Sequence, residues 1–187
     1  MSDQVLAVYL MAERCAIRPA QVSDLQALTE AVSHPKWPAA LPLSDFYRNG
    51  ELPSWLDRMC QRNKTSDSAV WAIDLLSGES SIGQVSLIAR PQDHVLSFWL
   101  SPSYWGSGLA REAVTKVLEH VLSAGAVKRV WAATALWNEQ SAKLMLDVGF
   151  TEGPVLENGY TANGTSHAVR QFHLQSHMGA SCAPTEA

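Results

Sequence analysis

The segment from Leu109 to Leu122 constrains the fold more than any other part of the sequence. Its apolar residues recur in pairs with charged or polar residues between them, and this spacing predicts a helix with one buried face: Leu109/Ala110, Ala113/Val114, Val117/Leu118 and Val121/Leu122. Gly125 follows as a natural helix end. The preceding stretch "HVLSFWLS" (94–101) is apolar on both faces, which predicts a central strand. A buried strand followed by an amphipathic helix requires helices packed on a sheet.

The other periodic segments predict a mixed sheet with helices packed on it, that is, an α/β (α+β) fold. Strands are expected at 14–20, 69–76, 81–90, 94–101, 128–136, 150–156 and 167–175, and helices after Ser23 and over 53–63, 109–122 and 138–150. A very short connection makes 69–76 and 81–90 antiparallel neighbours. The proline-rich segment 33–45 is expected to be a loop or a broken segment, and the segment 157–166 is rich in turn residues.

Size and composition predict one folded domain and argue against several classes of partner. The chain has 187 residues, of which 47% are hydrophobic, enough to bury a substantial core. The formal net charge is −4 and no block of Lys or Arg occurs, so we expect no nucleic-acid partner. Cys15, Cys60 and Cys182 show neither a CxxC motif nor metal-ligand spacing, which favours a reducing compartment and no metal site.

The two ends of the chain differ from the middle. Residues 1–12 contain an apolar run from Val5 to Ala12 that has no basic segment before it and is far too short to span a bilayer. We expect a leader or an extra strand there, no membrane partner, and a cytoplasmic protein. Residues 176–187 are small and polar and are expected to be a disordered tail. The domain is therefore expected to cover residues 13–175.

Two glycines, Gly106 and Gly108, lie between the central strand and the strong helix. The first N–H groups of a helix have no partners within the helix, and glycines allow an anion to approach them closely, so the loop is a candidate phosphate site. Ser107 can add a hydroxyl donor. The alternative is that the glycines only permit a tight turn. A Walker A loop needs Lys and Ser or Thr after its last glycine, and a dinucleotide fingerprint needs a third glycine near Arg111, so neither motif is present.

Three motifs in order resemble one known family. "FWLSPSYWGSGLAREA" resembles the acetyl-CoA signature of the GCN5-related N-acetyltransferases (GNAT), in particular the RimJ/RimL-like branch. "NEQSAKLMLDVGF" resembles that family's second-helix motif, and "RCAIRPAQVSDLQAL" resembles its usual opening. The resemblance spans residues 13–175. It implies a mostly antiparallel mixed sheet of about six or seven strands with about four helices, and acetyl-CoA as co-substrate.

The resemblance also implies a set of cofactor-binding residues. The end of the central strand would pair with the pantetheine arm, the glycine loop would bind the diphosphate, and two residues of the second helix would contact the cofactor. These residues are Trp99 and Leu100, then Trp105, Gly106, Ser107, Gly108, Leu109 and Ala110, then Asn138 and Ser141. Asn138 is equally placed to cap its helix.

The activity that the resemblance implies is direct transfer of an acetyl group from acetyl-CoA to a primary amine, either a protein N-terminus or a small-molecule amine. The family's usual tyrosine acid falls at Met145, which cannot donate a proton, so Ser141 is the candidate catalytic acid. The oxyanion is expected to meet strand N–H groups near 98–100. The usual glutamate position holds Val95, and the base is left open between a water chain and four side chains: His94, Asp93, Glu157 and His173.

The acceptor is expected to lie between segment 34–59 and the turn at 157–166. Aromatic residues there are candidates for a pocket wall, or else for buried packing: Trp37, Phe46, Tyr47 and Trp55. Asp45, Glu51 and Asp57 would favour a cationic amine. We expect a monomer or homodimer. The alternative function is a non-catalytic acyl-CoA-binding module of the same fold.

Overall fold

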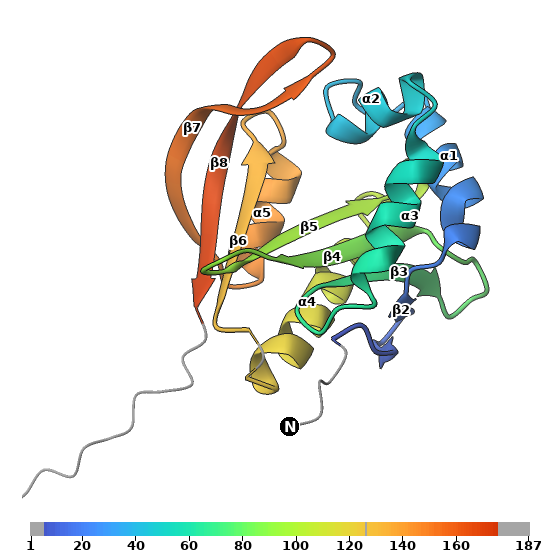
Figure 1. Cartoon of the computed structure of the whole chain (residues 1–187), viewed down its shortest axis with the longest axis vertical. Helices are drawn as coiled ribbons and strands as arrows, with labels where there is room; N and C mark the ends of the chain where they lie inside the picture. The colour runs from blue at the N-terminus through green and yellow to red at the C-terminus, as the bar shows by residue number, and fades with distance from the viewer. Residues whose placement is uncertain (1–5, 126, 176–187) are drawn as a thin grey trace, which may run out of the picture.

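A computed structural model describes residues 6–125 and 127–175 (Figure 1). One sheet of eight strands has the order β1-β2-β3-β4-β5-β6-β8-β7. The strands are β1 (Leu10–Met11), β2 (Cys15–Pro19), β3 (Ala69–Leu75), β4 (Gly83–Ala89), β5 (His94–Leu100), β6 (Arg129–Ala135), β7 (Thr151–Ala162) and β8 (Thr165–Gln175). The helices are α1 (Leu25–Ser33), α2 (Pro42–Arg48), α3 (Leu52–Arg62), α4 (Leu109–Ser123) and α5 (Glu139–Asp147), with short 3-10 turns η1 (Val22–Asp24) and η2 (Pro102–Tyr104).

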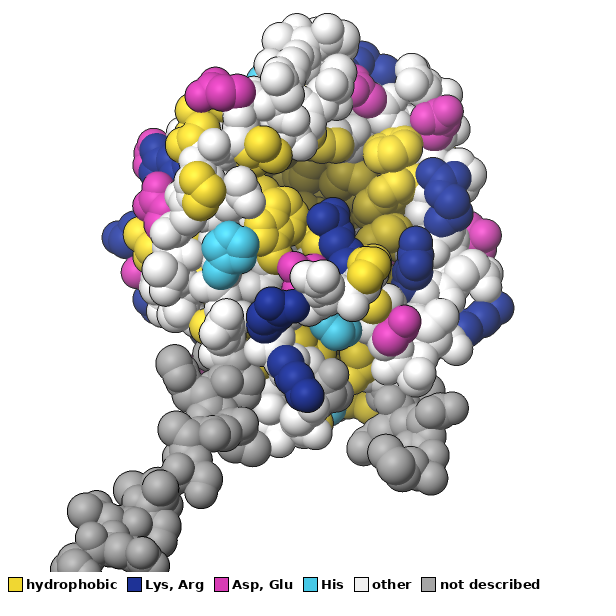
Figure 2. Space-filling model, turned by 60° about the vertical axis from the view of Figure 1, so that its left-hand side comes forward, with side chains coloured by type: hydrophobic (Ala, Val, Ile, Leu, Met, Phe, Trp, Pro, Cys, Tyr) yellow, Lys and Arg dark blue, Asp and Glu magenta, His cyan; other side chains and the backbone are white. Residues whose placement is uncertain are grey.

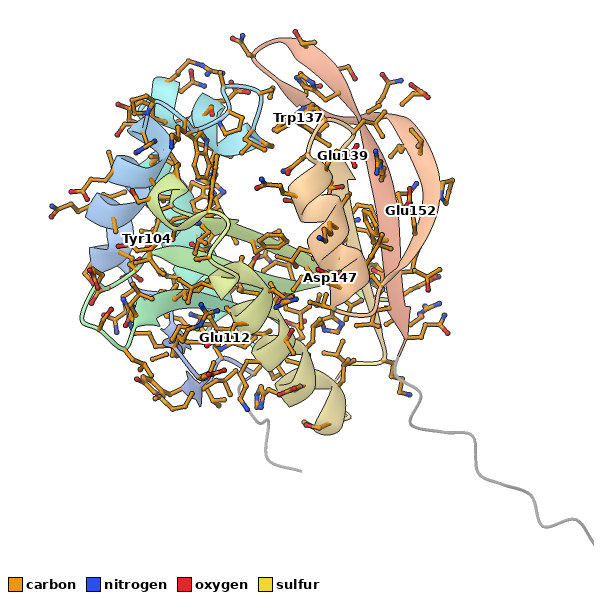
Figure 3. The ribbon with its side chains drawn as sticks, turned by 180° about the vertical axis from the view of Figure 1, so that it is seen from behind. Tyr104, Glu112, Trp137, Glu139, Asp147 and Glu152 are labelled. Atoms are coloured by element: carbon orange, nitrogen blue, oxygen red, sulfur yellow. The ribbon has the colours of Figure 1, made fainter. Side chains whose placement is uncertain are left out.

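Helices cover both faces of the sheet, and each face has its own core. Figure 3, seen from behind, shows α4 and α5 together on one face, while α3 crosses the front of the sheet in Figure 1. The core on the α4 side includes Trp71, Val114 and Phe172, all fully buried. A second cluster joins α1, α2 and α3 around Leu28 and Leu56. Alternating apolar residues of the strands contribute to the first core, whereas the second consists of residues of the helices and their connection, with Trp99 of β5 packed against it.

The sheet divides between β5 and β6, the two parallel neighbours. Only two residue pairs join them, His94 with Val130 and Val95 with Trp131. The other side of β5 pairs with β4 along its whole length, from His94 to Leu100. Beyond Val95, therefore, β5 has no strand on its β6 side in the part of the chain that the structure describes. The helix α4 provides the long connection that two parallel strands require.

The expected α/β (α+β) class with a mostly antiparallel mixed sheet is confirmed, and the strand count is eight rather than six or seven. Part of the apolar run at residues 5–12 forms β1, which pairs with Ala16 and Ile17 of β2. The antiparallel pairing of 69–76 with 81–90 is also confirmed, as β3 with β4. Residues 1–5 and the expected tail 176–187 lie outside the described residues. None of the described helices is long and apolar enough to cross a membrane.

Two segments expected to be irregular contain regular structure: residues 34–41 are the irregular connection that was expected, but α2 begins at Pro42. Pro42 occupies the first turn of α2, where the missing N–H of proline costs nothing, so a proline-rich segment still contains a helix. The segment 157–166 is mostly strand, because β7 continues to Ala162 and β8 begins at Thr165. Only Asn163 and Gly164 turn the chain, with φ of 51° and 69°, as an Asn-Gly hairpin turn requires.

The tip of the β7–β8 hairpin reaches across to α2 (Figure 1). The backbone N–H of Asn163 donates to both carboxylate oxygens of Asp45, at 2.9 and 3.1 Å. Arg48 also donates to this carboxylate. The hairpin and the helical segment after α1 are therefore connected on the side of the molecule where β5 and β6 have separated.

Candidate active site

A cleft of about 670 Å³ opens where β5 and β6 separate. This volume lies within the range of small-molecule sites, roughly 300–1,000 Å³. The walls come from the α1–α2 connection, the end of β5, the loop before α4, and the helices α4 and α5. The lining residues are Trp37, Pro38, Leu41, Phe98, Trp99, Leu100, Tyr104, Trp105, Gly106, Gly108, Ala110, Arg111, Trp137, Asn138, Glu139, Gln140, Ser141, Lys143, Leu144 and Asp147.

The glycine loop presents open backbone to this cleft. Gly106 and Gly108 have φ of 76° and 81°, in the left-handed region that glycine adopts most readily. A Cβ atom at Gly106 would meet no other atom within 4 Å. In the described part of the chain, the N–H groups of Gly106, Gly108, Ala110 and Arg111 have no acceptor. Such a cluster of free N–H groups at a helix N-terminus suits an anion.

Arg14, just before β2, forms hydrogen bonds with both the glycine loop and α4. Its Nη1 donates to the carbonyl of Ser107 at 2.9 Å, while its Nε donates to the Glu112 carboxylate at 2.8 Å. The backbone N–H of Arg14 reaches the same carboxylate at 2.6 Å. Glu112 belongs to the first turn of α4. Arg14 therefore binds both the glycine loop, through the carbonyl of Ser107, and α4, through the carboxylate of Glu112.

The Glu112 carboxylate accepts hydrogen bonds from Arg14, and its pKa lies below its ordinary value. Burial acts to raise the pKa, but hydrogen bonds from the backbone and side chain of Arg14, together with its charge, outweigh that effect. The thiol of Cys15 lies 3.6 Å from the same carboxylate. Burial, followed by the negative charge of Glu112, raises the pKa of Cys15 to about 12.

The end of β5 is shaped by two tryptophans and a glycine. The indole N–H of Trp105 donates to the carbonyl of Leu100 at 2.7 Å, which joins the strand end to the loop. The indole N–H of Trp99 is buried and has no partner among the described residues. A Cβ at Gly83 of β4 would lie 2.6 Å from the carbonyl of Trp99, so only glycine permits this close approach of β4 and β5.

Two cations line the cleft beside the glycine loop. Arg111 lies in the first turn of α4 and Lys143 lies on α5. The side chain of Arg111 is 62% exposed and reaches Asp147 of α5 only at 4.0 Å. With the free N–H groups, these cations make the loop end of the cleft suitable for a diphosphate.

The comparisons with known proteins agree with this geometry. A family model described as an acetyltransferase (GNAT) domain matches residues 14–151. The chain belongs to the GNAT acetyltransferase family. The uncharacterized N-acetyltransferase YoaA of Bacillus subtilis is 30% identical over 107 residues, which are 56% of this chain and 60% of YoaA. The match thus spans less than two thirds of that relative.

Solved GNAT structures share the fold. The Mycobacterium smegmatis RimJ structure, in complex with CoA-disulfide, superposes with a TM-score of 0.74 at 18% identity, over 94% of this chain and 89% of RimJ. A chimera of the spermidine N-acetyltransferase SpeG from Vibrio cholerae superposes with a TM-score of 0.71 at 17% identity, over 88% of this chain and 96% of the chimera.

On α5, this GNAT chain places a hydroxyl in the cleft. Asn138 caps the helix, its side-chain oxygen accepting the N–H of Ser141 at 3.2 Å, and both residues line the cleft. Met145, the position at which many family members were expected to carry a tyrosine, is fully buried in the core. Tyr104, a second hydroxyl-bearing residue that the sequence did not single out, also lines the cleft.

Most of the expected cofactor residues come together in the GNAT cleft, and two do not. The lining includes Trp99, Leu100, Trp105, Gly106, Gly108, Ala110, Asn138 and Ser141. Leu109 instead packs in the core at 5% exposure. The hydroxyl of Ser107 donates to the carbonyl of Tyr104 at 2.5 Å, and Ser107 is absent from the lining. Leu109 and Ser107 therefore stabilise the conformation of the loop before α4 and do not form part of the cleft wall.

None of the four side chains considered as a base lines the cleft: Asp93, His94, Glu157 and His173. The ring of His94 lies 3.0 Å from the backbone carbonyl of Asp67, at the far end of β5 from the cleft. Of the carboxylates considered for a cationic acceptor, Asp45, Glu51 and Asp57, none lines the cleft either. Within residues 6–125 and 127–175, no group of three or more His, Cys, Asp or Glu is placed to hold a metal ion.

The aromatic residues of segment 34–59 divide between wall and packing. Trp37 lines the cleft, whereas Phe46 and Trp55 pack against each other with ring centroids 6.1 Å apart. Tyr47 is 42% exposed outside the lining. Lining residues that sequence reasoning did not single out include Arg111, Trp137, Glu139 and Lys143. All four are one or two positions along the chain from an expected contact (Ala110, Asn138 or Ser141), and this closeness in sequence was the available signal.

Proposed function

We propose that this GNAT chain is an acetyl-CoA-dependent N-acetyltransferase that moves an acetyl group to a primary amine. The observation that carries the proposal is the set of free N–H groups at Gly106, Gly108, Ala110 and Arg111, which opens on the same cleft as the unpaired edge of β5. The glycines leave room for phosphate oxygens, and Arg111 and Lys143 add positive charge. The pantetheine arm would then lie along β5 beyond Val95, where backbone groups on the β6 side have no strand partner.

The reaction needs a free amine, a donor for the developing oxyanion, and an acid for the leaving thiolate. The amine nitrogen bonds to the thioester carbonyl carbon, and the carbon–sulfur bond then breaks. A backbone N–H of residues 98–100 is the proposed oxyanion donor. Ser141 is the proposed acid, since it lies in the first turn of α5 and lines the cleft. The amine is proposed to lose its proton to water, because none of the side chains considered as a base lines the cleft, and water returns a proton to Ser141 after Ser141 has protonated the thiolate.

Calorimetric titration with acetyl-CoA, followed by a thiol-release assay over a panel of primary amines, tests the proposal. We expect saturable binding and release of one thiol for each amine acetylated, with the product confirmed by mass spectrometry. Acetyl-CoA binding without turnover on any amine would favour the non-catalytic acyl-CoA-binding module. Absence of acetyl-CoA binding would contradict both functions.

A further inference from the structure

We infer that the acceptor end of the cleft takes a primary amine carried on a flat, apolar group, that is, an arylalkylamine and not a polyamine. The inference rests on the proposed function, since it names the acceptor class for the same site. It depends on three observations: the aromatic wall, the pairing of the nearby carboxylate, and the position of the cations.

The end of the cleft away from the glycine loop is walled by indoles. Trp37, only 8% exposed, lies edge-on to Trp99 with ring centroids 6.3 Å apart, and Leu41 packs against the same cluster. Trp137, which Figure 3 labels at the start of the α5 segment, lines the same cleft and is 44% exposed. Figure 2 shows a hollow lined with hydrophobic side chains below the tip of the hairpin. Rigid flat walls bind a flat apolar group better than a flexible chain, because little conformational freedom is lost.

The carboxylate at this end is already paired. Glu139, at the start of α5, accepts two hydrogen bonds from Arg170 of β8, at 2.5 and 3.1 Å. The other carboxylate that lines the cleft, Asp147, is at the opposite end of α5, about 12 Å further along the helix. Figure 3 shows these two acids at the two ends of α5. Among the described residues that line the cleft, therefore, no carboxylate beside the indoles is left unpaired for a second or third ammonium group of a polyamine.

The positively charged side chains of the cleft also disfavour a polyamine. Arg111 and Lys143 line the same cleft on its glycine-loop side, so they add positive potential that an extended polycation bound in the cleft would meet. Like charges disfavour such a ligand, whereas a ligand with one amine and an uncharged body meets no repulsion once its amine is neutral. The SpeG relative is a spermidine N-acetyltransferase, so its acceptor class is the natural comparison.

The test compares amines of matched size on the full chain. Initial rates of thiol release from acetyl-CoA are measured with 2-phenylethylamine, tryptamine, 2-cyclohexylethylamine, spermidine, and a peptide with an N-terminal serine. We expect kcat/KM for the two arylalkylamines to exceed that for spermidine by at least about tenfold, with the non-planar cyclohexyl compound between them. Equal or higher kcat/KM with spermidine or the peptide would overturn the inference and leave the proposed function intact.

A binding measurement separates the two proposals. The same amines are titrated calorimetrically into the protein saturated with CoA. Preferential binding of arylalkylamines without turnover would support this inference and contradict the proposed function. Absence of preferential binding, with or without turnover, would overturn the inference.

Two tryptophan variants locate the binding site. Trp137→Ala removes a half-exposed indole, and we expect KM for 2-phenylethylamine to rise at least about tenfold with the Kd for CoA nearly unchanged. Trp131→Ala is the matched control, because that indole donates to Gln171 and contacts Arg90 outside the cleft. An equal rise of KM in both variants would overturn the assignment of the aromatic wall.

Discussion

Arg14 binds Glu112 through both its backbone N–H and its guanidinium, across 98 residues of sequence. The same guanidinium binds the carbonyl of Ser107 in the glycine loop. The pair therefore connects the start of β2 to the helix whose N-terminus is the candidate diphosphate site. Its effect on ligand binding is indirect, since neither residue lines the cleft.

Glu112→Gln and Arg14→Ala should each weaken both the fold and the loop. We expect each to lower the free energy of unfolding by about 1.5–3 kcal/mol, the usual range for hydrogen bonds to charged groups. The two effects should be less than additive in the double variant, and the Kd for CoA should rise in all three. Urea unfolding and calorimetric titration measure these quantities. Lys116→Ala, which removes an exposed pair with Glu119, is the control and should change little. Strictly additive effects would contradict the coupling.

The lowered pKa of Glu112 makes part of the stability depend on pH. A carboxylate whose folded pKa lies below its ordinary value of 4.5 contributes stability above that value, and the contribution is lost as pH falls through the folded pKa. The wild-type protein should thus exceed Glu112→Gln in stability by a constant amount near neutral pH and by a decreasing amount below about pH 4.5. Urea unfolding at a series of pH values measures the difference, and a difference that does not change with pH would contradict this cause.

Gly106→Ala should reduce ligand affinity more than it reduces stability. The space around the added methyl is free, but a left-handed φ of 76° costs a non-glycine residue roughly 1–2 kcal/mol, and the methyl would lie where phosphate oxygens are proposed to bind. We expect the Kd for CoA to rise at least about tenfold. Gly125→Ala, with φ of 66° and equal free space at the other end of α4, should cost similar stability and leave the Kd unchanged. Equal losses of affinity in both would show that strain alone is responsible.

Ser141→Ala and Tyr104→Phe distinguish the two hydroxyls of the cleft. If Ser141 protonates the leaving thiolate, its loss should lower kcat by about a hundredfold with the Kd for CoA nearly unchanged, while Tyr104→Phe stays near the wild-type rate. Steady-state kinetics and calorimetry measure the two constants. The reverse pattern would transfer the acid role to Tyr104.

Cys15 should be chemically inert in the folded protein. Its side chain is fully buried and its pKa is raised to about 12, so almost no thiolate forms near neutral pH. Iodoacetamide should leave Cys15 unmodified in the native state and modify it in urea, as peptide mass mapping measures. Cys60, which is only half-buried, should react faster. Native labelling of Cys15 at the rate of Cys60 would contradict the prediction.

Local patterns predicted the elements well, and long-range contacts were not predictable from them. The apolar pairs of α4 and the apolar run of β5 carry their own signal, so both elements appeared where expected, although only Leu96 and Leu100 of β5 are buried. The helix α2 was missed because prolines at a helix start resemble prolines in a loop. The full length of β7 and β8 was missed because turn-forming residues are tolerated in exposed strands. The pairing of Arg170 with Glu139, or of Arg14 with Glu112, depends on tertiary placement that no local pattern encodes.

The cleft is bounded at both ends by hydrogen bonds. At one end, two residue pairs hold β5 against β6, and at the other end the backbone of Asn163 binds Asp45. A cleft held by hydrogen bonds at both ends cannot widen by rotation of one half of the molecule against the other unless the hydrogen bonds at one end break. The width of the cleft in the folded chain therefore depends on these two sets of hydrogen bonds, one of which joins residues 118 positions apart.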